Sequence, residues 1–264
     1  MSWRLIEEID NDVYRNLAID ESLARTLAIQ EEKKNTLRFW RAECAVVIGR
    51  FQCVHEEVNL AYCEENKIPI ARRFTGGGSV YHDSGNLNFS ICVDKSESYV
   101  PSSLKDVYET FIGGIVEGLK SISIPARYDQ VRQCIRIRNL KITGTAGWLK
   151  RGVAFLHGTL LVSADLTKLR ASLNPPENQP VYLRDRSRIR CTKSKRDNVT
   201  NIADVMTDSP SLDEIKQVVI ESISRLSGQP VERGHLTTQE KDTSQVLYQS
   251  RYSKASWNLG TLAP

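Results

Sequence analysis

Apolar side chains recur at helical spacing in several stretches of the chain. The clearest case is residues 104–120, where four apolar residues stand four positions apart and would form one buried face of a helix. Weaker repeats of this spacing indicate the other helices. Helix-breaking residues such as Pro175-Pro176 mark where a helix ends. The sequence therefore predicts helices at residues 11–28, 56–66, 104–120, 166–173, 212–226 and 243–252.

Short apolar or alternating runs between these stretches predict β-strands. Residues 45–49 are apolar and β-branched and end at a glycine, which is typical of a buried strand. A hairpin is expected where residues 134–138 and 140–143 meet. The other expected strands are residues 36–40, 68–73, 86–93 and 153–162. Because strands come in groups with helices between them, we predict an α+β fold with a central mixed or antiparallel sheet flanked by helices, not a parallel doubly wound sheet.

The composition is that of an ordinary globular protein. The chain has 264 residues, of which 40% are hydrophobic and 26% charged, and this suits one large domain with a buried core. It has no apolar run of the roughly 18 residues that a membrane span needs, and the acidic N-terminus lacks a signal or transit pattern. We therefore expect a cytoplasmic protein without membrane association, whose six cysteines are reduced and mostly buried. They are Cys44, Cys53, Cys63, Cys92, Cys134 and Cys191.

Positive charge is concentrated in two segments. Residues 130–164 contain six basic residues and no acidic one, and residues 184–196 contain seven basic residues against Asp185 alone. A local excess of this kind suits an anionic ligand such as a nucleoside triphosphate. A solvated basic surface and a nucleic-acid interface are the alternatives. We expect no nucleic-acid partner, because no recognition motif and no run of aromatic stacking residues accompanies the charges.

Three consecutive glycines follow the strand expected at residues 68–73. Gly76, Gly77 and Gly78 lack Cβ atoms, so the backbone can approach a ligand closely and its N–H groups can converge on an anion. Arg73 adds a fixed charge and a two-pronged donor beside them. The segment is neither a Walker A loop nor a dinucleotide fingerprint. Taken alone, it could equally be a flexible turn.

The flanking residues carry a family resemblance. Residues 72–86 read Arg-Arg-Phe-Thr-Gly-Gly-Gly-Ser-Val-Tyr-His-Asp-Ser-Gly-Asn, which resembles the lipoate-binding loop of the lipoate-protein ligase A family, within the biotin/lipoate ligase superfamily. Residues 46–59, residues 140–146 (Leu-Lys-Ile-Thr-Gly-Thr-Ala) and residues 157–166 (beginning His-Gly-Thr-Leu-Leu) resemble further segments of that family in the same order. The resemblance runs over nearly the whole chain.

This resemblance implies a biotin/lipoate ligase-like catalytic domain over residues 1–264. It implies ATP-dependent activation of lipoate or octanoate to acyl-AMP, with Mg²⁺. The acyl group would then pass to a lysine of apo lipoyl domains of 2-oxoacid dehydrogenase complexes, or of the glycine cleavage H protein. The residues implied to bind lipoate and ATP are Arg73, Gly76, Gly77, Gly78, Ser79, Val80, Tyr81, Lys141, Ala146 and His157.

Lys141 is the expected catalytic residue. Forming an acyl-adenylate brings the acyl carboxylate against the α-phosphate of ATP, and a cation between them lowers the repulsion and stabilises the developing charge. Lys141 offers an ammonium on a flexible stem in a segment without acidic residues, and Gly144 permits close approach. The resemblance gives Lys141 the same role. A surface lysine in a hairpin is the alternative.

Other chemistry-bearing residues have weaker assignments. His82 and His157 are candidates for proton handling or orientation, or are hydrogen-bonded structural histidines. Asp129 matches an acidic position ahead of the family lysine and is expected to hold magnesium or to orient Lys141. The acyl chain needs an apolar slot, and the candidates to line it are Trp40, Val47, Val80, Tyr81 and Leu87. The alternative is that these residues are ordinary core.

The sequence departs from long bacterial members of the family near its C-terminus. Trp257-Asn258-Leu259-Gly260, which resembles the segment before their accessory domain, is followed by four residues. We therefore expect no accessory domain, as in archaeal short forms, and a separate small protein that replaces it. Activation by this chain alone should then be poor. The loop at residues 178–197 is expected to cover the adenylate.

Four other functions remain open, and one of them is a lipoyltransferase that depends on preformed lipoyl-AMP. An octanoyltransferase would form a thioester on a cysteine, but none stands near Ala126, where cysteine-using relatives carry it, and Cys134 in the expected hairpin is more simply structural. Biotin ligases carry a Gly-Arg-Gly-Arg-x-Gly-Arg segment, which is absent. A non-catalytic lipoate-binding or RNA-binding subunit would keep the glycines but would not need Lys141.

Overall fold

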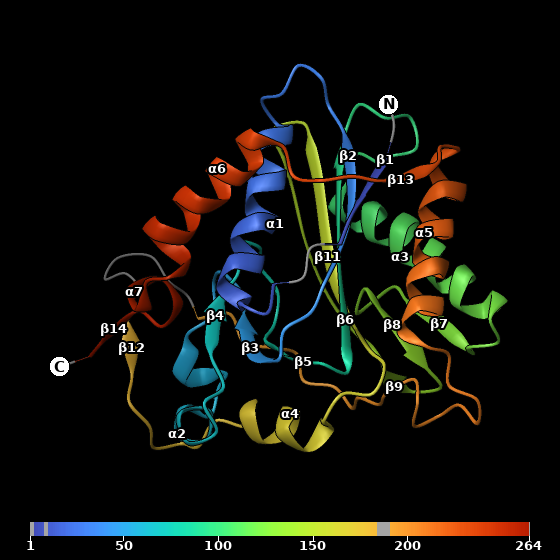
Figure 1. Ribbon diagram of the computed structural model, residues 1–264. Coiled ribbons are helices and arrows are strands. Elements are labelled where there is room, and N and C mark those ends of the chain that lie inside the picture. Colours follow the sequence, from blue (N-terminus) through green and yellow to red (C-terminus); the bar gives the residue numbers. More distant parts are fainter. Residues whose placement is uncertain (1–2, 8–9, 184–190, 264) are drawn as a thin grey trace.

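The computed structural model describes all residues except 1–2, 8–9, 184–190 and 264 (Figure 1). Its helices are α1 (Val13–Leu27), α2 (Leu60–Glu65), α3 (Leu104–Ser121), α4 (Leu166–Ser172), α5 (Leu212–Ser227), α6 (Thr238–Leu247) and α7 (Ala255–Asn258). Its strands are β1 (Trp3–Ile6), β2 (Asn35–Trp40), β3 (Cys44–Ile48), β4 (Ile70–Arg72), β5 (Val80–Asp83), β6 (Asn86–Asp94), β7 (Ala126–Asp129), β8 (Cys134–Ile137), β9 (Leu140–Lys141), β10 (Thr143–Lys150), β11 (Val153–Leu161), β12 (Tyr182–Leu183), β13 (Val231–Arg233) and β14 (Thr261–Leu262).

A six-stranded sheet forms the centre of the fold, in the order β10-β11-β6-β2-β1-β13. β1 runs parallel to β2 and β13, and the other neighbours are antiparallel. Figure 1 shows α1 and α6 on one face of this sheet and α3 and α5 on the other. The prediction of an α+β fold with a mixed sheet between helices is confirmed.

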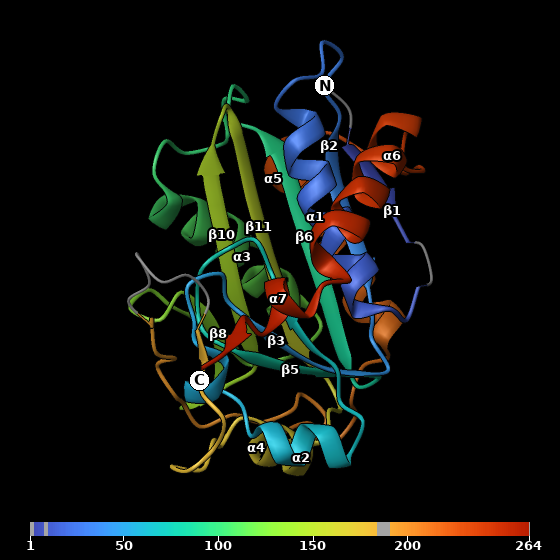
Figure 2. The ribbon, with the colours of Figure 1, turned by 90° about the vertical axis from the view of Figure 1, so that its left-hand side faces the viewer.

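Two smaller sheets carry the segments that the sequence analysis singled out. In the sheet β4-β3-β5, residues 73–79 connect β4 to β5, and we call them the glycine loop. In the sheet β7-β8-β9, Lys141 ends the last strand. Figure 2 shows β3 and β5 next to the lower ends of β10 and β11, with α2 and α4 beneath them.

The helix boundaries follow their caps. The side chain of Asp12 caps α1 and that of Ser103 caps α3, close to the predicted starts. The predicted start of the last long helix at residue 243 is wrong, because Thr237 and Glu240 form a capping box that begins α6 at residue 238. The helix predicted at residues 56–66 is also too long, since Asn59 caps α2 and the residues before it form a short 3-10 turn.

The least predictable strand is β10. It contains Gly144 and Gly147 and little apolar alternation, so its local sequence does not favour a strand. Eight residue pairs with β11, from Thr143–Leu160 to Lys150–Val153, hold it extended. The other strands that lay outside the predicted ranges are β1, β5, β7, β12, β13 and β14. Within the described residues, no helix is long and apolar enough to cross a membrane.

Candidate active site

The glycine loop packs closely against the end of β3. A Cβ atom on Gly49 would lie 2.1 Å from the carbonyl oxygen of Gly77, so the two backbones approach as only glycine permits. Gly77 also has a φ of 89°, in the left-handed region that L side chains rarely adopt. The loop is therefore fixed in place by close packing, and the alternative of a freely flexible turn does not describe it.

Arg73 holds the loop from beneath. Its buried guanidinium donates 2.7 Å hydrogen bonds to the carbonyl oxygens of both Gly76 and Gly78, and a 3.3 Å bond to that of Val47. Burial lowers the pKa of Arg73 to about 10, so the group is still charged at neutral pH. From the sequence, Arg73 is expected to donate to an anionic ligand. In the structure these donors are directed to the loop itself.

This arrangement leaves N–H groups of the loop available. The carbonyl groups of Gly76 and Gly78 point to Arg73, so the N–H groups of the same two peptide planes, those of Gly77 and Ser79, point away from it. The N–H groups of Gly76, Gly77 and Gly78 donate no hydrogen bond to any described residue. The N–H group of Ser79 is occupied by the Ser194 hydroxyl at 2.9 Å. Three consecutive amide donors of the loop thus have no partner among the described residues.

A buried polar chain connects the loop to the central sheet. His157 Nε2 lies 2.8 Å from the Thr75 hydroxyl, and its Nδ1 lies 3.4 Å from Asp20 on α1. Arg38 pairs with Asp20 at 2.8 Å. Burial lowers the pKa of His157, so its ring is neutral at neutral pH. His157 is therefore a buried, hydrogen-bonded histidine that links the glycine loop to α1.

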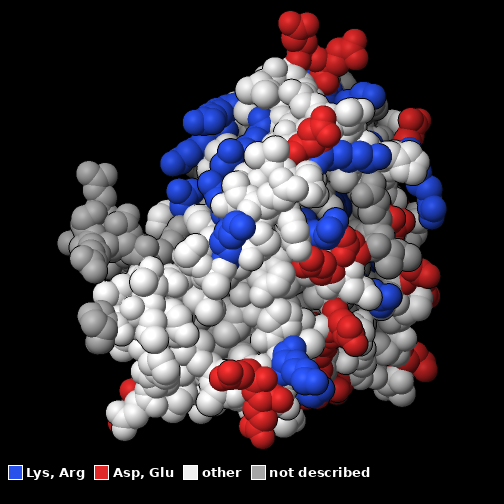
Figure 3. All heavy atoms as spheres, turned by 60° about the vertical axis from the view of Figure 1, so that its left-hand side comes forward, with Lys and Arg blue, Asp and Glu red and all other residues white. Residues whose placement is uncertain are grey.

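The loop borders a main cavity of about 1130 Å³. Its walls come from the glycine loop, β9, β10, α4 and residues 192–199. Its charged lining among the described residues is Arg132, Lys141, Arg170, Lys193, Lys195 and Arg196, with Asp197 as the acidic member. Figure 3 shows basic side chains gathered on the upper part of one face, beside a wide uncharged surface. The lining charge suits a polyanion such as a triphosphate.

Lys141 reaches this cavity from the end of β9. Its backbone accepts from Thr200 and donates to Asn198, which fixes the strand end. The Lys141 ammonium makes no hydrogen bond or ion pair with a described residue. Burial lowers its pKa, against the opposing influence of Cys134 and Asp197. Among the described residues, Lys141 is therefore a partly desolvated cation on the cavity that forms no direct ion pair, and the alternative of a surface lysine does not describe it.

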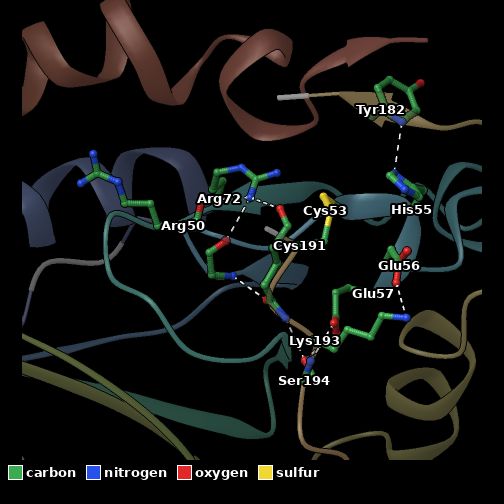
Figure 4. Close-up of a disulfide and its surroundings, with 12 residues drawn as sticks. Arg50, Cys53, His55, Glu56, Glu57, Arg72, Tyr182, Cys191, Lys193 and Ser194 are labelled. Carbon is green, nitrogen blue, oxygen red and sulfur yellow. Dashed lines mark hydrogen bonds and ion pairs between the residues drawn. A yellow bond between two sulfur atoms is a disulfide. The ribbon is translucent and has the colours of Figure 1, made fainter. Parts of the chain in front are cut away.

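Residues 191–199, which we call the strap, close one side of the cavity. Ser194 donates from its N–H and its hydroxyl to Glu57, at 2.7 and 2.5 Å. The same carboxylate accepts from the Ser79 hydroxyl at 3.0 Å and from Arg196 at 3.1 Å. Figure 4 shows Glu57 beside Ser194, with Lys193 reaching Glu56. Glu57 thus ties the strap to the glycine loop.

A disulfide between Cys53 and Cys191 adds a covalent tether to the strap (Figure 4). The prediction of six reduced thiols is therefore wrong for this pair, and is confirmed for Cys44, Cys63, Cys92 and Cys134. The pairing closes a loop of 138 residues, and no local spacing could have signalled it. Residues 184–190 of the loop predicted at 178–197 lie outside the described residues.

Asp129 does not take the predicted position. Its carboxylate accepts from Arg136 at 2.6 Å and from the N–H groups of Val131 and Arg132, and it contacts neither Lys141 nor the main cavity. The described residues contain no group of three or more His, Cys, Asp or Glu side chains that could hold a metal. Mg²⁺ is usually bound by one or two carboxylates together with substrate phosphates, and Asp129 does not fit that role.

A second, narrow space of about 30 Å³, the inner slot, lies beneath the loop. It shares Val80, Gly144, Thr145 and Thr159 with the main cavity, so the two spaces are neighbours. Of the residues predicted for the acyl chain, Trp40, Val47 and Val80 line the slot. Tyr81 borders the main cavity instead. Leu87 is fully buried in the core that α3 and α5 cover, so for this residue the alternative of ordinary core holds.

The structure gathers the remaining predicted residues into this one region. Those that line the main cavity are Gly76, Gly77, Gly78, Ser79, Val80, Tyr81 and Lys141. Those that line the inner slot are Arg73, Val80, Ala146 and His157. His82 also lines the slot, and burial lowers its pKa to about 3.

The sequence profile of the lipoyl protein ligase A/B catalytic domain matches residues 12–224. The chain belongs to this family. Among its lipoyl ligase relatives, lipoate-protein ligase A subunit 1 of Thermoplasma acidophilum is 32% identical over 267 residues, covering 98% of this chain and 96% of that relative.

Two solved structures agree with this membership. A lipoate-protein ligase A bound with ATP is similar with a TM-score of 0.83 at 30% identity, over 98% of this chain and 99% of that one. A bipartite lipoate protein ligase from T. acidophilum, described with its E2 lipoyl domain, gives a TM-score of 0.83 at 32% identity, over 100% and 98% of the two chains. The expected ligase-like architecture is confirmed.

Sequence reasoning gave no role to three residues that hold this lipoyl ligase site together. Asp20 stands on the apolar face of α1 between Leu17 and Leu23, and a carboxylate at such a position is a readable signal of a buried partner. Glu57 and Thr75 carry no such signal. Their partners Ser194 and His157 lie 137 and 82 residues away in the chain.

Proposed function

We propose that the chain is a lipoate-protein ligase that activates lipoate with ATP and transfers the lipoyl group to a lysine of an apo lipoyl domain. The observation that carries the proposal is the position of Lys141. Its desolvated ammonium lies on the same cavity as the three amide donors of the glycine loop. One site therefore offers a cation and an amide nest to two anions that must meet.

In the first step, a carboxylate oxygen of lipoate attacks the α-phosphorus of ATP. The bond to the β-phosphate oxygen breaks, and pyrophosphate leaves with the electron pair. Lys141 offsets the repulsion between the carboxylate and the phosphate, and it stabilises the charge in the transition state. Lys195 and Arg170, which line the cavity without a described ion-pair partner, add to the attraction for the triphosphate. No step is assigned to Mg²⁺, since Asp129 is committed to Arg136.

In the second step, the amine of the acceptor lysine attacks the carbonyl carbon of lipoyl-AMP. The amide bond forms, the amine loses a proton, and AMP leaves. Hydrolysis of the mixed anhydride must be prevented meanwhile, and the strap is placed to limit the access of water to the cavity. Its attachments to Glu57 and Cys53 hold it there.

A cysteine-dependent octanoyltransferase is disfavoured by the position of Cys134. Its side chain is buried on β8 and does not line the main cavity. Burial also raises the pKa of the thiol, which reduces the thiolate that a nucleophile needs. Lys141, in contrast, has the surroundings that an adenylating enzyme requires.

A separate accessory protein forms part of the proposal. The T. acidophilum relatives are named as a subunit and as a bipartite ligase, and this chain is similar to them over nearly its full length. We infer that a small partner improves activation here too. The glycine cleavage H protein remains a predicted acceptor beside the lipoyl domain.

The test combines the chain with ATP, lipoate and an apo lipoyl domain, with and without a candidate accessory protein. Intact-mass spectrometry of the domain measures lipoylation. The proposal predicts slow modification by the chain alone, a clear increase with the accessory protein, and transfer from preformed lipoyl-AMP that depends less on it. A folded chain that transfers nothing from lipoyl-AMP would contradict the proposal.

A further inference from the structure

The buried guanidinium of Arg136 on β8 lies between two carboxylates beside the main cavity. Its Nε donates to Asp129 at 2.6 Å, and its two Nη groups donate to the two carboxylate oxygens of Asp197, Nη1 at 3.2 Å. Nη1 also donates to the carbonyl oxygen of Asn139 at 2.8 Å, in the turn between β8 and β9. Each nitrogen of the guanidinium therefore has a protein partner, and the contact with Asp197 is the two-pronged pair typical of arginine and carboxylate.

The two carboxylates differ in what else holds them. Asp129 also accepts from the N–H groups of Val131 and Arg132, so its position does not depend on Arg136 alone. Asp197 makes no other side-chain hydrogen bond or ion pair with a described residue. Loss of Arg136 would therefore leave the Asp197 carboxylate, and not that of Asp129, without a partner.

Asp197 lies next to the expected catalytic lysine. The strap runs beside β9, where the N–H group of Lys141 donates to Asn198 at 2.9 Å and that of Thr200 donates to Lys141 at 3.1 Å. Arg136 and Lys141 stand opposite each other in the β8-β9 register, so their side chains share one face of the hairpin. Asp197 and Lys141 both line the main cavity, yet no ion pair joins these two described side chains.

An ion pair between Asp197 and Lys141 would interfere with the proposed first step. The ammonium has to contact the acyl carboxylate and the α-phosphate as they approach each other. A paired Asp197 would compete for that ammonium and would add a further negative charge where two anions must meet. The contact with Arg136 engages both oxygens of Asp197 instead.

We propose that Arg136 is a positioning residue, which keeps Asp197 from pairing with Lys141 and so leaves the ammonium free for the substrates. This inference rests on the proposed function and adds a residue that acts through Lys141 in the same reaction. The carboxylate of Asp197 has its own structural use, because its pair with Arg136 fastens the strap to the β8-β9 hairpin.

The first test replaces Arg136 and measures acyl-AMP formation from lipoate and ATP, by the full chain with and without a candidate accessory protein. Arg136→Gln removes the charge and the two-pronged pair, and Lys141 is then a neighbouring cation for Asp197. We expect kcat/KM to fall by roughly tenfold to a hundredfold, which is less than the loss expected on removing Lys141 outright.

Two double variants of equal net charge separate this role from a merely structural one. Arg136→Gln combined with Asp197→Asn removes the competing carboxylate and should recover most of the lost activity. Arg136→Gln combined with Asp129→Asn removes the other partner of Arg136 and should stay as slow as Arg136→Gln. If Arg136 only stabilised the hairpin, neither second change would restore activity.

The pH profile of kcat/KM gives a second readout. Burial lowers the pKa of Lys141, and the other groups that act on it are Cys134 and Arg136 from β8, Asp197 from the strap and Arg132 from the turn before β8. A paired carboxylate favours the ammonium. The alkaline fall in activity should therefore move to higher pH in Arg136→Gln and move back when Asp197→Asn is added.

Urea unfolding checks that each variant is folded. If Arg136→Gln does not fold, Arg136→Lys takes its place, because a lysine keeps the charge but lacks the two-pronged geometry. Its smaller loss of activity should again be relieved by Asp197→Asn and not by Asp129→Asn.

Full activity in the folded Arg136 variant would overturn the inference. It would also be overturned if Asp197→Asn restored no more activity than Asp129→Asn. In both cases acyl-AMP formation by the unchanged protein would still support the proposed function. Absence of acyl-AMP formation by the unchanged protein would contradict the proposed function, and the inference with it.

Discussion

His157 Nε2 and the Thr75 hydroxyl lie 2.8 Å apart, and this hydrogen bond joins the central sheet to the glycine loop. Thr75 also accepts from Arg73 at 3.2 Å. The loop is thus held by two buried side chains, while the N–H groups of Gly76, Gly77 and Gly78 have no partner among the described residues. The glycine backbone is therefore held in place by Arg73 and His157, which do not themselves line the main cavity.

Arg73→Lys should damage both the fold and the activity. A lysine keeps the charge but is a single point donor, so the carbonyl groups of Gly76 and Gly78 cannot both stay paired. We expect the free energy of unfolding to fall by roughly 1–3 kcal/mol and acyl-AMP formation to fall further than stability alone explains. Urea unfolding and a pyrophosphate-exchange assay measure the two effects. Arg225→Lys, at an exposed position of α5, is the matched control, and equal behaviour of both variants would contradict this role.

The close approach of Gly49 to Gly77 gives a second test. Gly49→Ala places a methyl group where the loop carbonyl lies, so the loop must shift, and unfolding free energy should fall by roughly 1–3 kcal/mol. Gly113→Ala is the control, because a Cβ there meets nothing within 4 Å in the middle of α3. It should raise stability by roughly 0.5–1 kcal/mol. If both substitutions changed the free energy of unfolding in the same direction, the loop would be more adaptable than its packing indicates.

No thiol should be needed for acyl transfer. Cys134→Ser removes the candidate nucleophile of a thioester route, and we expect transfer to stay within about twofold of the unchanged protein. Intact-mass spectrometry of the enzyme during turnover should detect no acyl adduct. A trapped acyl-enzyme on Cys134, lost in the Ser variant, would move the chain to the transferase class.

The lowered pKa of Lys141 predicts a pH dependence. The ammonium is the active form, so acyl-AMP formation should fall as pH rises through a value below the ordinary lysine pKa of 10.5. Because the unfolded state binds this proton more tightly, stability should rise with pH across the same interval. The pH profile of kcat/KM checks the first statement. A profile that stays flat beyond the ordinary lysine pKa would contradict it.

The sequence predicted what depends on local pattern. The helix at residues 104–120, the hairpin that presents Lys141 and the glycine loop all follow from spacing, turns and motif. The sequence could not predict partners far apart in the chain. Glu57 finds Ser194 and Cys53 finds Cys191 only after the sheets are assembled. The partner of Asp129 was unpredictable for the same reason, since Arg136 pairs with its carboxylate from the neighbouring strand.

The proposed acyl-AMP formation depends most directly on Lys141, and one measurement tests this dependence. Pyrophosphate exchange, with lipoyl-AMP detected by mass spectrometry, is compared for the unchanged protein, Lys141→Ala and the control Lys150→Ala at the exposed end of β10. We predict that Lys141→Ala folds normally and loses roughly 10²–10³-fold in acyl-AMP formation, while Lys150→Ala stays active. Near-normal exchange by folded Lys141→Ala would contradict the central claim.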